Sequence, residues 1–192
     1  DPKIRDFVRI VMNSSPAIHV STEATKQHIA SAFDHGATFE ELLEVFEILC
    51  TVGVHSVIKG IPVLTDKSAD DEHTDLSDEQ RRVKDHFIEK RGFWDDDLWG
   101  VILSQDHAFL ETYADYSAHP WETGVLEPKV KELLYIAMDV GTPHFFTVGL
   151  GPHIENALSH GATPAEIMEV FEMQLEYGIH SIIHGLPLLI SE

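Results

Sequence analysis

The chain has 192 residues, 43% of them apolar, and a formal net charge of −20 from 33 acidic residues against 13 lysines and arginines. This length and apolar content are enough for a buried core, so the chain is not a disordered acidic tail. The negative charge repels nucleic acid and anionic membrane surfaces. We therefore expect a small-molecule or protein partner, and neither nucleic acid nor a membrane.

Helix signals begin in the first third of the chain. Thr38 and Glu41 have the spacing of a capping box, which predicts a helix start there. The apolar residues that follow recur every three to four positions. Gly36 is expected to end the preceding helix, and Gly60 with Pro62 to break this one.

The middle of the chain starts with an acidic stretch, residues 65–76, whose composition predicts a linker. Ser77 and Gln80 then form a further capping box, and the helix they open should stop near Gly92. No segment shows sustained period-two alternation, so we expect no sheet. Additional helices are predicted over residues 94–104, 107–116 and 128–139.

A large segment of the chain occurs twice. Residues 36–64 recur as 161–189 at a constant offset of 125, with 15 of the 29 aligned positions identical. The second copy has its own capping box at Thr163 and its own glycine and proline breaks. Such self-similarity indicates one structural unit used twice. The predicted organisation is all-α, with a first, N-terminally shortened repeat over 1–64, the linker 65–76, and a fuller second repeat over 77–192.

Four histidine pairs are retained in both copies. An identity kept twice reports what the shared unit needs, whether for packing or for chemistry. The pairs are His19 with His144, His28 with His153, His35 with His160, and His55 with His180.

Cys50 is the only cysteine, which excludes an internal disulfide, a Cys-x-x-Cys redox pair and a cysteine-rich zinc site. We interpret it as a core residue on the apolar side of its helix. The expected compartment is reducing and cytoplasmic. No apolar run approaches the roughly 20 residues of a membrane span, and no signal peptide is visible.

The order of motifs in the second repeat resembles a known family. Leu126-Glu127-Pro128 opens a helix, His153 follows a short loop, Gly161-Ala162-Thr163 begins the next helix, and Gly185-x-Pro187 comes last. This order, over about residues 77–189, is similar to the carboxymuconolactone decarboxylase family, which is related to the alkylhydroperoxidase D proteins. The resemblance implies an all-helical unit that assembles into rings. Because single-repeat members form hexamers, it implies a pseudo-hexameric trimer for a two-repeat chain.

The peroxidase branch of that superfamily uses a Cys-x-x-Cys-x-x-x-His helix start with an earlier glutamate. The matching stretch here, residues 142–153, contains neither cysteine. Thiol peroxidase activity is therefore not expected. The resemblance places Glu132 at the family's glutamate and His144 near its first cysteine.

These residues predict acid–base chemistry without a cofactor. His153 follows Gly151-Pro152, which suggests the first turn of a helix, where the dipole would keep its imidazole neutral. Glu132 would orient this ring or take its proton, and His144 would donate to the substrate. The first-repeat equivalents are Asp6, His19 and His28. We expect the chemistry in the second repeat, because the shorter side chain of Asp6 leaves its reach in doubt.

Structural readings compete with these assignments. His35 and His160 stand before capping glycines and are interpreted as helix caps. His55 and His180 are either buried histidines at a repeat interface or pocket residues. Glu44 and Glu169 are read as a solvated face or a subunit contact, and Glu132 could simply pair with Lys129 or Lys131.

A histidine-based metal site is the lesser alternative. His180 and His184 have the spacing of helical metal ligands, but the first copy has Lys59 in place of the second histidine. We therefore predict no metal and no cofactor.

The substrate prediction rests on charge. A lactone with two carboxylates would call for arginine, yet residues 92–192 contain no arginine and only Lys129 and Lys131 as lysines. Arg5, Arg9, Lys26 or Lys59 would have to reach across an interface. We predict a decarboxylase-like lyase acting on a less charged lactone, keto acid or related carbonyl compound. The alternative is a non-catalytic binding or assembly protein with the same fold.

Overall fold

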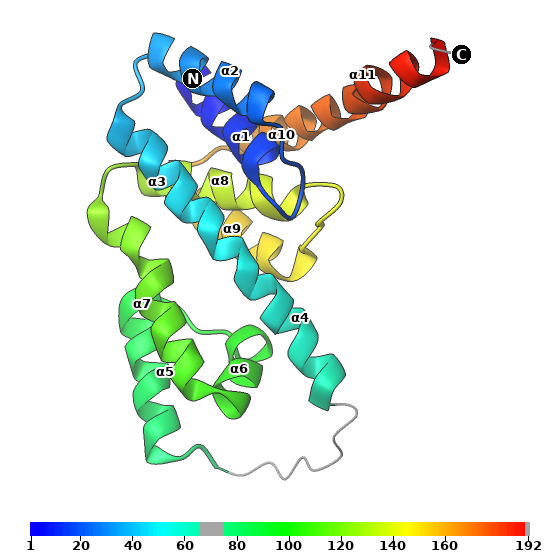
Figure 1. The fold of residues 1–192 in the computed structure, drawn as a ribbon. Helices are drawn as coiled ribbons and strands as arrows, with labels where there is room; N and C mark the ends of the chain where they lie inside the picture. The colour runs from blue at the N-terminus through cyan, green and yellow to red at the C-terminus, as the bar shows by residue number, and fades with distance from the viewer. Residues whose placement is uncertain (66–74, 191–192) are drawn as a thin grey trace. The chain divides into compact units, whose positions relative to one another are not determined.

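The computed structural model describes residues 1–65 and 75–190, apart from the side chains of residues 184 and 185. Helices joined by loops make up these residues, and no strand occurs among them. The all-α prediction is confirmed. The elements in chain order (Figure 1) are α1 Pro2–Ser14, α2 Thr22–Asp34, α3 Phe39–Cys50, η1 Thr51–Gly53, α4 Val54–Thr65, α5 Asp78–Arg91, the π-helical turn η2 Asp96–Gly100, α6 Val101–Gln105, α7 His107–Thr123, α8 Pro128–Val140, α9 Thr147–Ser159, α10 Pro164–Met173, η3 Gln174–Glu176 and α11 Tyr177–Ile190.

The chain divides into two compact units. Unit 1 consists of Asp1–Leu49 with Val125–Glu192, and unit 2 consists of Cys50–Gly124. Unit 1 therefore takes helices from both predicted repeats, and the repeat boundaries stay a prediction. Most of the predicted linker, residues 66–74, lies outside the described residues.

The capping boxes start helices where the sequence predicts them. The Thr38 hydroxyl accepts a hydrogen bond from the Glu41 amide at 3.1 Å, and the Glu41 carboxylate accepts one from the Thr38 amide at 2.8 Å. Thr163 with Glu166 and Ser77 with Gln80 make the same reciprocal bonds at the starts of α10 and α5. Each box satisfies two amides that the first turn would leave unpaired.

The expected helix ends are correct at the glycines and wrong at the prolines. Gly36 and Gly161 have φ values of +84° and +86°, in the left-handed region that a glycine after a helix adopts readily. In contrast, α4 and α11 continue through Pro62 and Pro187. A proline removes one backbone hydrogen bond, but its fixed φ is compatible with a helix. A helix can therefore continue past it with that bond missing.

Two of the short predicted helices also differ. The expected helix over 94–104 is the π-helical turn η2 running into α6, and α7 extends beyond Tyr116, through Pro120, to Thr123.

The core of unit 1 forms around α1 and α8. α1 packs against α2 and α8, and α8 packs against α9 and α10. All residues of α8 from Val130 to Asp139 are buried, whereas most surface helices bury only one stripe. The polar side chains of α8 between Val130 and Asp139 are therefore held inside the protein. Unit 2 packs α5 against α7, and α6 against both α4 and α7.

One polar residue of α3 is buried, contrary to expectation. Glu44 is 2% exposed, its Oε1 lies 2.5 Å from the Lys131 ammonium, and its Oε2 accepts from the Leu126 amide at 3.1 Å. The interpretation of Glu44 as a solvated or subunit-contact residue is wrong. Its partners lie far away in the sequence, so helical periodicity alone could not reveal them.

The helical stretch from Phe39 to Thr65 is long and apolar enough to cross a membrane by length and composition, with 27 residues and a mean hydropathy of 1.6. The sequence reading did not anticipate it. One such helix is weak evidence, because the core helix of a soluble protein passes the same test. The absence of a membrane partner stays an expectation.

Candidate active site

Three polar side chains share one face of α8. Glu132, Tyr135 and Asp139 are spaced three and four residues apart, which places them on the same side of the helix. Their exposed fractions are 2%, 3% and 1%. Two of them are acids, which are rarely so buried without a specific partner.

The neighbouring helix α9 places His153 against this face. Its Nδ1 lies 2.6 Å from Glu132 Oε2, and its ring stacks on Tyr135 with centroids 4.6 Å apart and planes 5° from parallel. When Nδ1–H donates to the carboxylate, Nε2 is the ring atom left to exchange a proton with a substrate. Glu132 thus fixes both the orientation and the tautomer of the ring, and it is not a surface partner of Lys129 or Lys131.

The position of His153 along its helix differs from the prediction. α9 begins at Thr147 and runs through Pro152, so His153 lies in the second turn. The dipole acts mainly within the first turn. The predicted helix-start environment is therefore wrong, and Glu132 and Tyr135 are the groups that surround the ring.

His144 lies in the loop between α8 and α9. Burial lowers the pKa of His144, and its ring stacks on Phe146 at a centroid distance of 5.8 Å. A ring nitrogen of His144 and a carboxylate oxygen of Asp139 lie within 4.8 Å of each other. The structure thus brings His144 to one end of the α8 face and His153 to the other.

Asp139 is the site residue that the sequence analysis missed. Burial raises its pKa to about 7, with the charge of His153 opposing the rise and that of Glu132 adding to it. The signal was present in the seven-residue spacing from Glu132, which is two helical turns along one face. Tyr135 could have been found in the same way.

Gly149 lets the Asp139 carboxyl reach the backbone of α9. A Cβ atom at position 149 would stand 2.6 Å from Asp139 Oδ2 and 2.9 Å from the Phe146 ring. The preceding Phe145 has a φ of +40°, which is uncommon for a residue with a side chain. This packing therefore needs a glycine at 149. The loop just before α9 is strained at Phe145.

The first repeat arranges its equivalent residues differently. α1 and α8 both have 13 residues beginning with proline, and Asp6 stands where Glu132 does. Asp6 Oδ2 accepts from the Ser31 hydroxyl at 2.8 Å and lies 2.8 Å from His35 Nδ1, whereas His28 Nδ1 is 3.6 Å from Oδ1. Burial, followed by the charge of Arg9, lowers the pKa of His28.

The remaining predicted residues fall into separate places. His19 lies against His180, at the start of α11, with ring centroids 4.5 Å apart. Tyr177 also borders this pair and donates to the Met12 carbonyl at 2.7 Å. His55 lies on α4 in unit 2, so His55 and His180 belong to different compact units. The side chain of His184 lies outside the described residues.

Comparison with known proteins gives these residues a context. No curated protein matches the chain. The sequence pattern of the carboxymuconolactone decarboxylase family matches residues 107–186, the stretch that contains Glu132, His144 and His153. A crystal structure from Burkholderia xenovorans, described as a "putative gamma-carboxymuconolactone decarboxylase subunit", is 36% identical over all of this chain and 78% of that one, with a TM-score of 0.91. The chain belongs to the carboxymuconolactone decarboxylase family.

The surroundings of Cys50 differ from those predicted from the sequence. The residue is exposed at the end of α3 and, within unit 2, lines a cavity of about 350 Å³ whose walls are mainly apolar. Its interpretation as a core residue is wrong, because it is exposed. Cys50 is separated by sequence and by unit from the Glu132–His153 pair.

Four basic residues of unit 1 that could anchor an anionic substrate are engaged in ion pairs. Arg5 binds Glu169, and Arg9 binds Glu176 with its closest contact at 2.7 Å. Glu169 therefore pairs with a residue of the same chain. Lys129 pairs with Glu166 at 3.1 Å, and Lys131 with Glu44 as described above.

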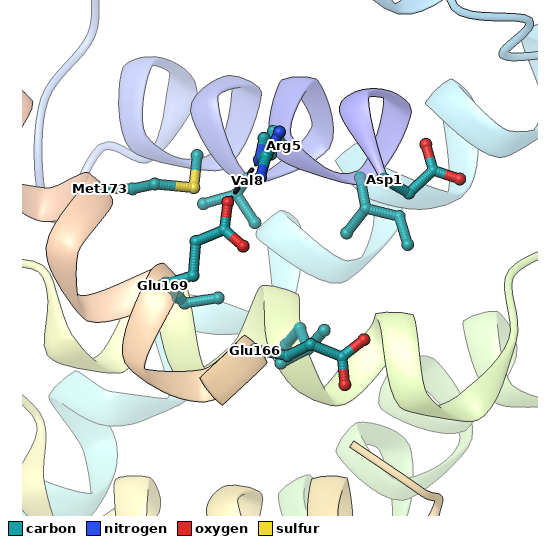
Figure 2. Close-up of a pocket in the computed structure, with 9 residues that line it drawn as sticks. Asp1, Arg5, Val8, Glu166, Glu169 and Met173 are labelled. Carbon is teal, nitrogen blue, oxygen red and sulfur yellow. Dashed lines mark hydrogen bonds and ion pairs between the residues drawn. The ribbon is translucent and has the colours of Figure 1, made fainter. Parts of the chain in front are cut away.

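The Arg5–Glu169 pair borders a small cavity between α1 and α10 (Figure 2). With about 40 Å³ it has room for a few water molecules. None of the predicted site residues lines it, so we do not assign it to the substrate.

Proposed function

We propose that the protein is a cofactor-free lyase of the decarboxylase kind, acting by proton transfer on a small lactone, keto acid or related carbonyl compound. The observation that carries the proposal is the buried contact of 2.6 Å between Glu132 and His153. The name of the Burkholderia relative supports the same reaction class.

The roles of the two residues follow from this contact. Glu132 holds the imidazole through Nδ1, and Nε2 is left to exchange a proton with the substrate oxygen that takes up the electron pair. Loss of carbon dioxide leaves an electron pair in the substrate, which a neighbouring carbonyl or lactone group can hold. A proton must then return to carbon, and we assign this donation to His144. This chemistry needs no metal or flavin.

The charge of the site favours a substrate with few carboxylates. Both lysines of residues 125–190 and both arginines of α1 are paired with glutamates. A dicarboxylate would have to displace one of these four ion pairs, recruit another basic residue such as the exposed Lys26, or be bound by neutral donors. We therefore place monocarboxylate lactones and keto acids ahead of γ-carboxymuconolactone as substrates.

The experiment compares turnover of γ-carboxymuconolactone, a monocarboxylate lactone and a β-keto acid by the intact chain and by His153→Gln. We expect release of carbon dioxide from at least one compound and a loss of at least about 100-fold in kcat in the variant. Glu155→Gln, at an exposed position on the same helix, serves as the control. Tight binding without turnover, equal in both proteins, would favour the non-catalytic binding protein instead.

We further propose that the protein works as a cytoplasmic homo-oligomer, most simply a trimer. The supporting observation is the apolar surface of α11, where Ile179, Ile182 and Leu186 are 58%, 60% and 47% exposed. Apolar surface in this amount commonly belongs to an interface.

A further inference from the structure

Asp139 has no part in the Glu132–His153 pair, yet it is the most deeply buried polar group on the α8 face. Burying a carboxyl is costly, and the cost is lowest when the group keeps its proton. Its neighbours in unit 1 are specific. A ring nitrogen of His144, in the loop before α9, lies within 4.8 Å of a carboxyl oxygen of Asp139. On the α9 side, Asp139 Oδ2 occupies space that a side chain at Gly149 would need.

We propose that Asp139 is a positioning residue of this site, which supplies through the His144 imidazole the proton that the reaction returns to carbon. The inference rests on the proposed function for its chemistry. The pairing of Asp139 with His144 can be tested without any substrate.

The protonation states suit this role. The Asp139 pKa is near 7 because of burial, so near neutral pH the carboxyl is in part protonated, while burial lowers the pKa of His144 and keeps that ring neutral. Within unit 1, the charged groups that act on Asp139 are Glu132 on its own helix, which favours the protonated carboxyl, and His153 on α9, which opposes it when protonated. An acid and a neutral base thus stand next to each other.

The proton balance of the step is simple. The bond between the substrate carbon and its carboxylate breaks, and its electron pair moves into the adjacent carbonyl group. His144 then gives one proton to that carbon and receives one from the Asp139 carboxyl. After product leaves, the Asp139 carboxylate takes a proton from water. One proton is consumed for each carbon dioxide released, as decarboxylation of a carboxylate requires.

The test is a pH titration by NMR of the intact chain carrying ¹³C-labelled aspartate and ¹⁵N-labelled histidine, with no ligand added. We expect the Asp139 carboxyl carbon to titrate near pH 7 and the His144 ring nitrogens to show an inflection at the same pH, because coupled groups titrate together. Asp139→Asn should remove that inflection. Asp34→Asn, at an exposed position at the end of α2, should leave it unchanged.

A titration of Asp139 at an ordinary aspartate pH in the wild-type chain would overturn the proposal, and this result does not depend on any variant folding. An unchanged His144 curve in Asp139→Asn would also overturn it. If turnover is found, the variant should lower kcat at least about 10-fold with little change in KM and should lose the decline in activity above pH 7. Absence of turnover would count against the proposed function while the NMR result still decides the pairing.

Discussion

Asp6 binds His35 at 2.8 Å, although the matching acid of the second repeat, Glu132, binds His153. Aspartate is one methylene shorter than glutamate, and Ser31 and His35 already occupy its Oδ2 atom. His28, the equivalent of His153, is left at 3.6 Å. The first repeat therefore uses its acid to tie α1 to α2, and the second repeat holds the better oriented imidazole.

This asymmetry predicts unequal effects of matched substitutions. His28→Gln should change kcat by less than about threefold, whereas His153→Gln should lower it at least about 100-fold. Steady-state kinetics on the same substrate, with circular dichroism to verify helicity, measures both. Equal losses would mean that both repeats carry chemistry.

Asp139 should make the stability of the protein depend on pH. Its pKa is raised from 3.8 to about 7, so the folded state binds the proton more tightly than the unfolded state. The stability that Asp139 contributes is then fully present below about pH 4 and is lost as the pH rises through 7. This contribution amounts to roughly 4 kcal/mol at most. Thermal unfolding of Asp139→Asn should show a smaller loss of Tm between pH 5 and pH 8 than the wild type. A parallel decline in both proteins would contradict the raised pKa.

The ion pair of Glu44 with Lys131 should be critical for folding. Both side chains are 2% exposed, and removing one partner of a buried pair leaves an uncompensated charge, at a cost of about 3–5 kcal/mol. Lys131→Met should therefore destabilise strongly in denaturant titrations. Lys129→Met breaks the more exposed pair with Glu166 and should cost below about 1 kcal/mol.

The sequence predicted helices well where the signal is local. The boxes at Thr38, Ser77 and Thr163 start helices, and the glycines at 36 and 161 follow helix ends, because these effects depend on neighbours within a few residues. It failed at Pro62 and Pro187, which lie exposed inside helices that continue past them. A proline costs one backbone hydrogen bond but has a φ that a helix accepts, so it need not end one. It also failed at Glu44, whose burial depends on a lysine that only the folded chain brings near.

The candidate site was predictable in part for a similar reason. Glu132 and His153 were found by resemblance and do make contact. Asp139 was missed because it is not among the residues that both repeats share, since the first repeat has Asn13 at the matching place in α1. The helical face shared with Glu132 was the available signal.

Self-association should depend on α11. Ile182→Glu places a charge among exposed apolar residues and should convert the expected trimer into smaller species, as measured by multi-angle light scattering at micromolar concentration. Val20→Glu, at an exposed apolar position in the loop between α1 and α2, is the control and should leave the mass unchanged. A wild-type monomer would contradict the proposed assembly.

Cys50 should be dispensable for the proposed reaction. It is the only cysteine, so it cannot form the internal redox disulfide of the thiol peroxidases. Cys50→Ser should therefore retain nearly all activity, and treatment with a chelator should leave kcat unchanged, because proton transfer between histidines and carboxylates needs neither a thiol nor a metal. Loss of activity in Cys50→Ser would point to thiol chemistry. Loss after chelation that is reversed by a divalent cation would replace the acid–base mechanism with a histidine-based metal site.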